Sequence, residues 1–242
     1  MVLVSEQIPA CCLDRLVKSG YTPILLPADK RLAKPVASHP DMLLYIAQDR
    51  IITDRFYYEN IAHRQLDEVC RACGLPLQCT EEKVSCDYPY DIRFNAARVG
   101  KYLFCYPAYT SHAILETARR EQLTIIPIRQ GYARCSLCPV GDHALITADP
   151  SIYRAIHQKN SPDALLVQPG HVSLPGYPHG FIGGCCGADG DRLYFCGDLM
   201  RHPDGAAIHA FLNAHGIMPV SLSNEMLFDC GSLFFLPIHA SV

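Results

Sequence analysis

Short apolar runs separated by polar stretches recur along the whole chain at similar intervals. The first set of runs begins at Pro23, Leu75, Thr124, Leu165 and Met218. A second set covers Arg50–Thr53, Tyr102–Cys105, Ala144–Thr147, Leu193–Cys196 and Leu233–Leu236. Runs of this length predict buried strands. A period of about 40–50 residues is typical of solenoids, propellers and other arrays.

Apolar residues at helical spacing lie between the second run of one unit and the first run of the next. Ile152 with Ile156, and Ile208 with Leu212, follow the i, i+4 pattern of an amphipathic helix. Gly74 stands where the C-terminal cap of such a helix is expected. Four helices are predicted in this way for five pairs of strands.

A fifth helix is predicted at the start of the chain, from Leu13, Leu16 and Val17. The last unit stops at Leu236 and has no helix of its own. The N-terminal helix would complete that unit if the repeats form a ring. We therefore predict a single α/β domain over residues 1–242, a five-bladed α/β propeller of ββαβ repeats closed by the N-terminal helix.

Each unit also has a short segment of small and polar residues between its two apolar runs. These segments are residues 39–42, 91–95, 131–135, 179–184 and 228–232. The innermost strands of a ring crowd its axis, so small residues and glycine are expected there. Polar side chains that converge on that axis would form a binding or catalytic site.

Composition narrows the class of protein. The chain has 242 residues and a net charge of −3, without a block of like charges, which argues against nucleic acid as a partner. No apolar stretch approaches the ~18 residues of a membrane span, and the N-terminus lacks the pattern of a secretory signal. We expect a soluble, cytoplasmic protein with no membrane contact. The oligomeric state stays open.

The chain contains 13 cysteines, an odd number that is unlike a secreted disulfide framework. Buried, reduced thiols are the simpler interpretation. Two CxxC pairs, Cys70 with Cys73 and Cys135 with Cys138, raise the alternative of a zinc site. The first pair matches a helical core stripe. The second is expected on an inner strand with its thiols on opposite faces. We therefore predict no metal and no cofactor.

Three stretches resemble known sequences. Gly131–Val140 is similar to a dimethylarginine dimethylaminohydrolase stretch of the form G-L-H-x-K-S-x-C-S, and Pro40–Leu44 to its P-D-S-V-F. Ile217–Ser223 followed by Asp229–Phe234 resembles I-P-V-S-x-S and T-C-C-S-V-L. Together with the fivefold repeat, they make the chain resemble the pentein fold of guanidino-group-modifying enzymes, which includes arginine deiminases, amidinotransferases and non-catalytic ribosome anti-association factors.

The resemblance implies particular site residues. In those enzymes a thiolate attacks the guanidinium carbon, a histidine transfers protons, and a carboxylate holds the cationic substrate. The nucleophile position falls on Cys230 and one substrate-holding carboxylate on Asp41. A second acidic position falls near Asn95, with Asp91 close by. The histidine position falls on Ala133, which cannot carry a proton.

Other residues of the inner segments are further candidates. The glycine-rich stretch 170–187 contributes His171 and His179, and His179 is a candidate replacement for the missing acid–base group. Arg93 and Arg134 are candidates for binding an anionic group such as a carboxylate. Asp229, beside Cys230, is included among the residues expected to contact a ligand.

Two hypotheses about function follow. In the first, the chain is a divergent pentein that binds a small molecule, cationic or amino-acid-like, or a partner at its axial cleft. In the second, it is a cysteine-dependent hydrolase or amidinotransferase that acts on a guanidino compound through Cys230. Whether the chain is an enzyme is left open by the sequence.

Overall fold

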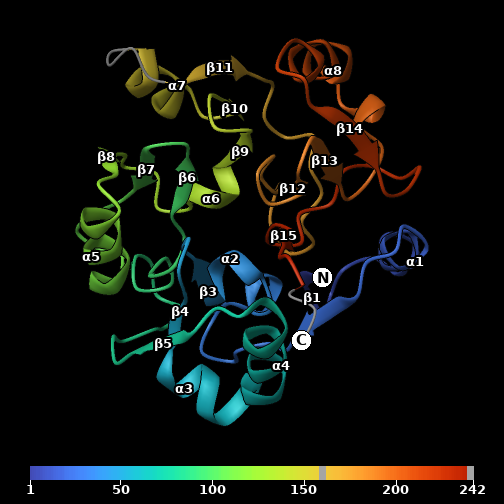
Figure 1. Cartoon of the computed structure of the whole chain (residues 1–242). Coiled ribbons are helices and arrows are strands. Elements are labelled where there is room, and N and C mark those ends of the chain that lie inside the picture. The colour runs from blue at the N-terminus through green and yellow to red at the C-terminus, as the bar shows by residue number, and fades with distance from the viewer. Residues whose placement is uncertain (158–161, 239–242) are drawn as a thin grey trace.

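Five small sheets of one design make up the computed structural model, which describes residues 1–157 and 162–238 (Figure 1). In each sheet an inner strand runs antiparallel to a middle strand, and the middle strand runs parallel to an outer one. Four sheets, inner strand first, are β3 (Leu44–Ile46), β4 (Ile51–Asp54), β5 (Leu77–Thr80); β6 (Ala97–Val99), β7 (Tyr102–Cys105), β8 (Thr124–Pro127); β9 (Leu137–Val140), β10 (Ala144–Thr147), β11 (Asp163–Leu166); and β12 (Cys186–Asp189), β13 (Arg192–Phe195), β14 (Met218–Ser221).

The fifth sheet is built from both ends of the chain. Its order is β15 (Phe234–Phe235), β1 (Val2–Ser5), β2 (Pro23–Leu26). Val2 pairs with Phe235 on one side and with Pro23 on the other. The terminal amino group of Met1 also donates a hydrogen bond to the carbonyl of Leu236, at 3.0 Å.

This arrangement corrects one prediction. The run Leu233–Leu236 was expected to be the middle strand of the fifth unit, but only two of its residues form a strand, and that strand is the inner one. The middle strand is β1, a fully buried four-residue run at the N-terminus that the repeat pattern did not include. The N-terminal helix does belong to this unit, as predicted, because it connects β1 to β2.

A crossover helix joins the middle strand to the parallel outer strand in every sheet, since parallel neighbours cannot be joined by a tight turn. The main crossover helices are α1 (Ala10–Lys18), α4 (His63–Cys73), α5 (His112–Arg120), α7 (Pro150–His157) and α8 (Gly205–Ala214). Shorter helical segments are α2 (Pro40–Leu43), α3 (Arg55–Tyr57), α6 (Ala133–Ser136), the 3₁₀ turns η1 (Lys34–Val36) and η3 (Leu199–Arg201), and the π-helical turn η2 (Tyr58–Ala62).

The crossover helices lie outside and the inner strands lie around a common centre (Figure 1). Each helix buries an apolar side chain against its sheet, for example Leu16, Leu66, Ile114, Ile152 and Ile208, all of them fully buried. This confirms the predicted helical stripes except at Val17, which is 54% exposed. Gly74 ends α4 in the left-handed conformation that a C-terminal cap requires.

Two of the inner segments are helical turns. The segment at residues 40–43 is α2 and leads into β3, and the segment at residues 133–136 is α6 and leads into β9. The polar residues of these turns therefore end close to the centre of the molecule, ahead of the strands. Most of the predicted site residues lie on or beside such turns.

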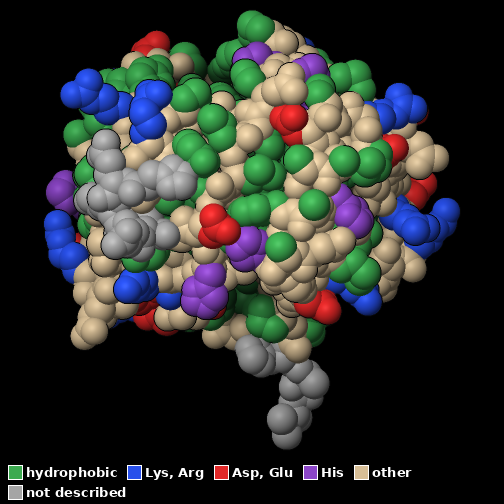
Figure 2. Space-filling view, turned by 90° about the horizontal axis from the view of Figure 1, so that it is seen from above, with side chains coloured by type: hydrophobic (Ala, Val, Ile, Leu, Met, Phe, Trp, Pro, Cys, Tyr) green, Lys and Arg blue, Asp and Glu red, His purple; other side chains and the backbone are tan. Residues whose placement is uncertain are grey.

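The outer surface is mixed in character. Figure 2 shows the side of α7 and α8, where hydrophobic side chains are interspersed with isolated acidic residues and histidines, and Lys and Arg lie towards the edges. Within the described residues, no helix is both long enough and apolar enough to span a bilayer.

Candidate functional site around the central cavity

A cavity of about 230 Å³ opens at the centre of the molecule and is called the central cavity below. Three buried polar side chains line it: His39, which directly precedes α2, Cys135 of α6, and Asp229, which lies ahead of β15. Aromatic residues supply much of the remaining wall, among them Tyr132 and Phe181, whose rings stack at 6.1 Å. The cavity combines a carboxylate, an imidazole and a thiol with flat apolar surfaces.

His39 and Asp229 form a buried pair. Nδ1 of His39 lies 3.7 Å from Oδ1 of Asp229, and the two side chains are 2% and 1% exposed. Nδ1 has no hydrogen-bond partner within the described part of the chain. Burial lowers the pKa of His39 to about 4, although the charge of Asp41 opposes this effect. The imidazole is therefore neutral at pH 7.

Asp229 keeps its ionised form within the physiological range. Burial raises its pKa to about 6, while the backbone N–H groups of Phe181 and Gly231 donate hydrogen bonds that favour the carboxylate. The nearby charge of Arg134 acts in the same direction. At neutral pH the central cavity thus contains a carboxylate next to a neutral imidazole with an unpartnered nitrogen.

Asp41 is fully buried just behind the cavity wall. Its Oδ2 accepts hydrogen bonds from the Ser232 hydroxyl at 2.7 Å and from the Cys135 thiol at 3.2 Å, while Oδ1 has no partner among the described residues. Burial raises the pKa of Asp41. Burial and the charges of Asp41 and Asp229 also raise the pKa of Cys135 well above its usual value. Cys135 is therefore a protonated thiol and not an activated nucleophile.

Asn95 connects this acidic group to α6. Its side-chain oxygen accepts from the backbone N–H of Arg134 at 2.7 Å, and its amide nitrogen donates to the carbonyl of Asp41 at 3.1 Å. The same amide nitrogen lies 3.1 Å from the sulfur of Cys135. Asn95 thus holds two inner segments together and does not line the central cavity.

Arg134 serves the backbone. Its Nη1 donates to the carbonyls of Leu137 at 3.1 Å and Gly183 at 3.0 Å, and the side chain is buried. Together with Asp41 it lines a further cavity of about 250 Å³ on the other side of the buried network. It is the cation that faces both buried carboxylates, so it balances only one of the two negative charges.

Cys230 lies outside the central cavity. It is fully buried in an apolar cluster with Val4, Leu16 and other residues, and its sulfur is 3.3 Å from that of Cys196. The hydrogen bond with Cys196 lowers the pKa of Cys230, but burial and the charge of Asp229 outweigh it, and the pKa lies above the usual value. Nothing in this environment supports the predicted nucleophile.

The residue after Cys230 is the one that approaches the centre. A Cβ on Gly231 would lie 2.2 Å from Cβ of His39, and Gly231 has a φ of +72°, which also favours glycine. Ala133, where the resemblance placed the catalytic histidine, is fully buried in an apolar cluster. The histidine of the cavity comes instead from the first inner segment, two residues before Asp41.

Asp91 and Arg93 stabilise the loop beside the cavity. Asp91 accepts a hydrogen bond from the hydroxyl of Tyr132 at 2.6 Å, and burial raises its pKa. Arg93 donates to the carbonyls of Lys83 and Tyr109 and lies over the ring of Tyr90. Neither of them lines the central cavity.

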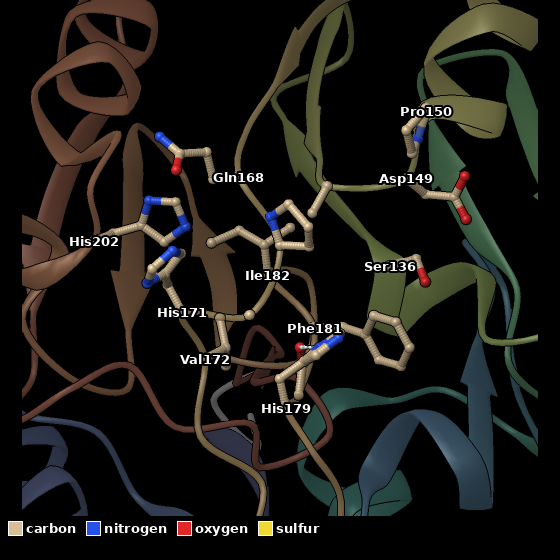
Figure 3. A pocket seen from close by; sticks show the side chains of 14 residues that line it. Ser136, Asp149, Pro150, Gln168, His171, Val172, His179, Phe181, Ile182 and His202 are labelled. Carbon is tan, nitrogen blue, oxygen red and sulfur yellow. Dashed lines mark hydrogen bonds between the residues drawn. The ribbon is translucent and has the colours of Figure 1, made fainter.

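The glycine-rich stretch contributes to the site in two ways. His179 lines the central cavity, as does Phe181, while its Nδ1 is hydrogen-bonded to the carbonyl of Gly180 at 2.9 Å. Gly180 and Gly184 allow the chain to pass close to Asp229, since a Cβ on either would lie within 2.4 Å of that side chain. His171 lies further out, in the adjacent cavity shown in Figure 3.

The two CxxC pairs do not come together. Cys70 and Cys73 lie on α4 and pack in the core, as expected. Cys135, however, belongs to the helical turn α6, and only Cys138 belongs to strand β9, so the prediction that both lie on one strand is wrong. Among the described residues, no group of three potential ligands is arranged to hold a metal ion.

Three solved structures have a similar fold. A Pseudomonas aeruginosa dimethylarginine dimethylaminohydrolase in complex with citrulline matches with a TM-score of 0.55 and 9% identity, over 92% of this chain and 91% of that one. A saxitoxin-pathway amidinotransferase from Microseira wollei matches with a TM-score of 0.55 and 14% identity. An inosamine-phosphate amidinotransferase from Streptomyces griseus matches with 0.54 and 15%. Both amidinotransferase matches cover 95% of this chain and 79% of the other.

These likenesses define the class: the chain has the pentein fold. At the level of sequence, a family model described as a family of unknown function (DUF6873) matches residues 3–234. The chain therefore belongs to that family. No curated protein sequence matches it.

Proposed function

We propose that the protein binds a small cationic molecule, guanidino- or amino-acid-like, in the central cavity, and that it does so without the cysteine chemistry of the enzymes it resembles. The observation that carries this proposal is the buried Asp229 carboxylate beside the unpartnered Nδ1 of His39. A buried polar atom without a partner in the protein is the position where a ligand group is expected.

The walls of the cavity suit a flat cation. Tyr132, Tyr177 and Phe181 present aromatic faces next to Asp229. A cation near such faces is attracted to the rings and forms a charge-assisted hydrogen bond with a carboxylate. The neutral His39 adds an acceptor or donor without adding charge.

The charges around the centre support the same sign of ligand. Asp41 and Asp229 face a single buried cation, Arg134, because the pKa of His39 keeps that side chain neutral. A cationic ligand would therefore balance the second carboxylate. A dimethylarginine dimethylaminohydrolase of similar fold holds citrulline, a small ligand, which supports a ligand of similar size here.

We also propose that the five sheets form a closed, five-bladed α/β propeller in one domain and that the protein works in the cytoplasm. The pairing of β15 with β1 joins the two ends of the chain, which supports closure. Closure would fix the inner segments around one axis, and it would keep His39 and Asp229 together although they lie far apart in the sequence.

Binding of a guanidinium ion is expected to strengthen with pH. The folded-state pKa of Asp229 is about 6, so the fraction of ionised carboxylate increases between pH 5 and pH 7. For a ligand that requires the charged form, affinity for butylguanidinium should rise about tenfold over this interval. Isothermal titration calorimetry at both pH values measures this change.

The matching variant is Asp229→Asn. It should lower the affinity for butylguanidinium at pH 7 by about 10–100-fold and remove the pH dependence. Asp142→Asn, which removes an exposed carboxylate outside the cavity, should bind as the wild type does. No binding by the wild type, or equal binding by Asp229→Asn, would overturn the proposal.

The alternative, a hydrolase or amidinotransferase that acts through Cys230, makes a different prediction. We expect native Cys230 to react with a haloacetamidine at least about tenfold more slowly than the exposed Cys11, because it is fully buried and mainly protonated. We also expect Cys230→Ala to retain butylguanidinium binding. Mass spectrometry of the labelled protein identifies the sites, and preferential labelling of Cys230 would restore the nucleophile hypothesis.

A further inference from the structure

A second cavity, of about 280 Å³, lies directly beside the central one (Figure 3). His179 and Phe181 line both cavities. The rest of the second cavity comes from segments that follow β10 and β11 and from His202, which lies just after η3. Its wall is mainly apolar, with Val172 and Ile182 close to Phe181 in Figure 3.

The helical turn α6 belongs to the wall between the two cavities. Cys135 lines the central cavity, whereas the next residue, Ser136, lines the second one. The ring of Phe181 stacks on Tyr132 of the central cavity and faces His179 edge-on. The two cavities are therefore separated by a few side chains.

Ser136 leaves a polar group unused. The side chain is 2% exposed, and its Oγ has no hydrogen-bond partner within the described residues. Leaving a buried hydroxyl unpaired costs about 1–3 kcal/mol. The hydroxyl lines the second cavity, so a ligand group there would supply the missing partner.

The other polar groups of the second cavity do not favour an anion. His202 accepts a hydrogen bond from the backbone N–H of Asp204 at 3.0 Å, and burial lowers its pKa, so its ring is neutral. Hydrogen bonds from Ser151 and Gln130 outweigh burial and hold the pKa of Asp149 below its usual value, so that carboxylate is charged. An uncharged group therefore fits better here than a carboxylate or phosphate.

We propose that the second cavity is a subsite for the distal part of the same ligand. This inference rests on the proposed function of the central cavity. The ligand class is a small cation with a flat apolar extension that ends in an uncharged hydrogen-bonding group such as a hydroxyl. The cation binds at Asp229, the extension passes His179 and Phe181, and the terminal group binds at Ser136.

Two probes test this assignment: butylguanidinium, and the same ion with a hydroxyphenyl group at the end of its chain. Wild-type protein should bind the extended ion about tenfold more tightly, as expected for burial of part of an aromatic ring. Ala148→Leu, which fills the second cavity, should remove this preference and leave the affinity for butylguanidinium unchanged. Ser136→Ala should reduce the preference about threefold or more.

Ala206→Leu on the exposed face of α8 is the matched control and should behave as the wild type does. Equal binding of both ions by the wild type, or a preference that survives in Ala148→Leu, would overturn the subsite while leaving the central site intact. Failure of the wild type to bind either ion would overturn the proposed function and, with it, the subsite. Calorimetry with both probes distinguishes these outcomes.

Discussion

Arg134→Met is expected to lower the free energy of unfolding by about 3–5 kcal/mol at pH 7. The guanidinium is buried and donates to the carbonyls of Leu137 and Gly183. Methionine fills similar space but leaves both carbonyls without these donors. It also leaves the carboxylates of Asp41 and Asp229 without the cation that faces them.

The loss should be larger at pH 7 than at pH 5. Arg134 lowers the pKa of both Asp41 and Asp229, so its removal raises these pKa values further above those of the unfolded chain. A carboxyl group with a raised folded-state pKa binds more protons in the folded state, and the free energy of unfolding then falls as pH rises. Urea unfolding followed by circular dichroism at both pH values measures the difference.

Arg93→Met provides the control for this experiment. Arg93 also donates to two backbone carbonyls, but it is partly exposed and braces a loop. Its replacement should cost less than about 1 kcal/mol, with little dependence on pH. If the two variants lose equal stability, or if Arg134→Met loses less at pH 7 than at pH 5, then the buried charge balance described here is wrong.

Much of the fold could be predicted because each unit has to bury the same kinds of surface. The outer strands, the middle strands of four units and the crossover helices all leave apolar residues at recognisable spacing. Strand β1 was missed because its pattern is only four residues long at the chain end. Its role depends on pairing with β15, more than 200 residues away, which no local pattern reveals.

The candidate site could be predicted in location but only partly in composition. The inner segments do meet at the centre, and Asp41, Asp229 and His179 lie on or beside the central cavity. Cys230 was misjudged because motif comparison does not show which way a side chain points. Asp229 lines the cavity, whereas Cys230 packs in an apolar cluster, as alternation along extended chain allows.

His39 and Cys135 were not singled out, although both lie in segments that had been identified as central. A histidine before a proline resembles an ordinary turn residue in sequence. What distinguishes His39 is its burial and its unpartnered nitrogen next to Asp229, and both depend on residues from the far end of the chain. Only the assembled fold provides that information.

Gly183→Ala is expected to reduce the free energy of unfolding by at least about 3 kcal/mol. A Cβ at this position would lie 2.3 Å from the carbonyl oxygen of Arg134, 2.5 Å from that of Leu137 and 2.6 Å from that of Cys135. All three atoms belong to the backbone, so no side-chain rotation can relieve the contact. The methyl group would force α6 away from the glycine-rich stretch.

The displacement would reach the binding site as well as the core. The carbonyl of Gly183 accepts the hydrogen bond from Arg134, and α6 carries Cys135 into the central cavity and Ser136 into the second one. Gly141→Ala is the matched control, since no atom lies within 4 Å of its added Cβ and only its φ of +57° opposes alanine. It should cost about 1–2 kcal/mol. Thermal and urea unfolding compare the two variants, and a loss for Gly183→Ala no greater than that for Gly141→Ala would show that α6 and this stretch are not in such close contact.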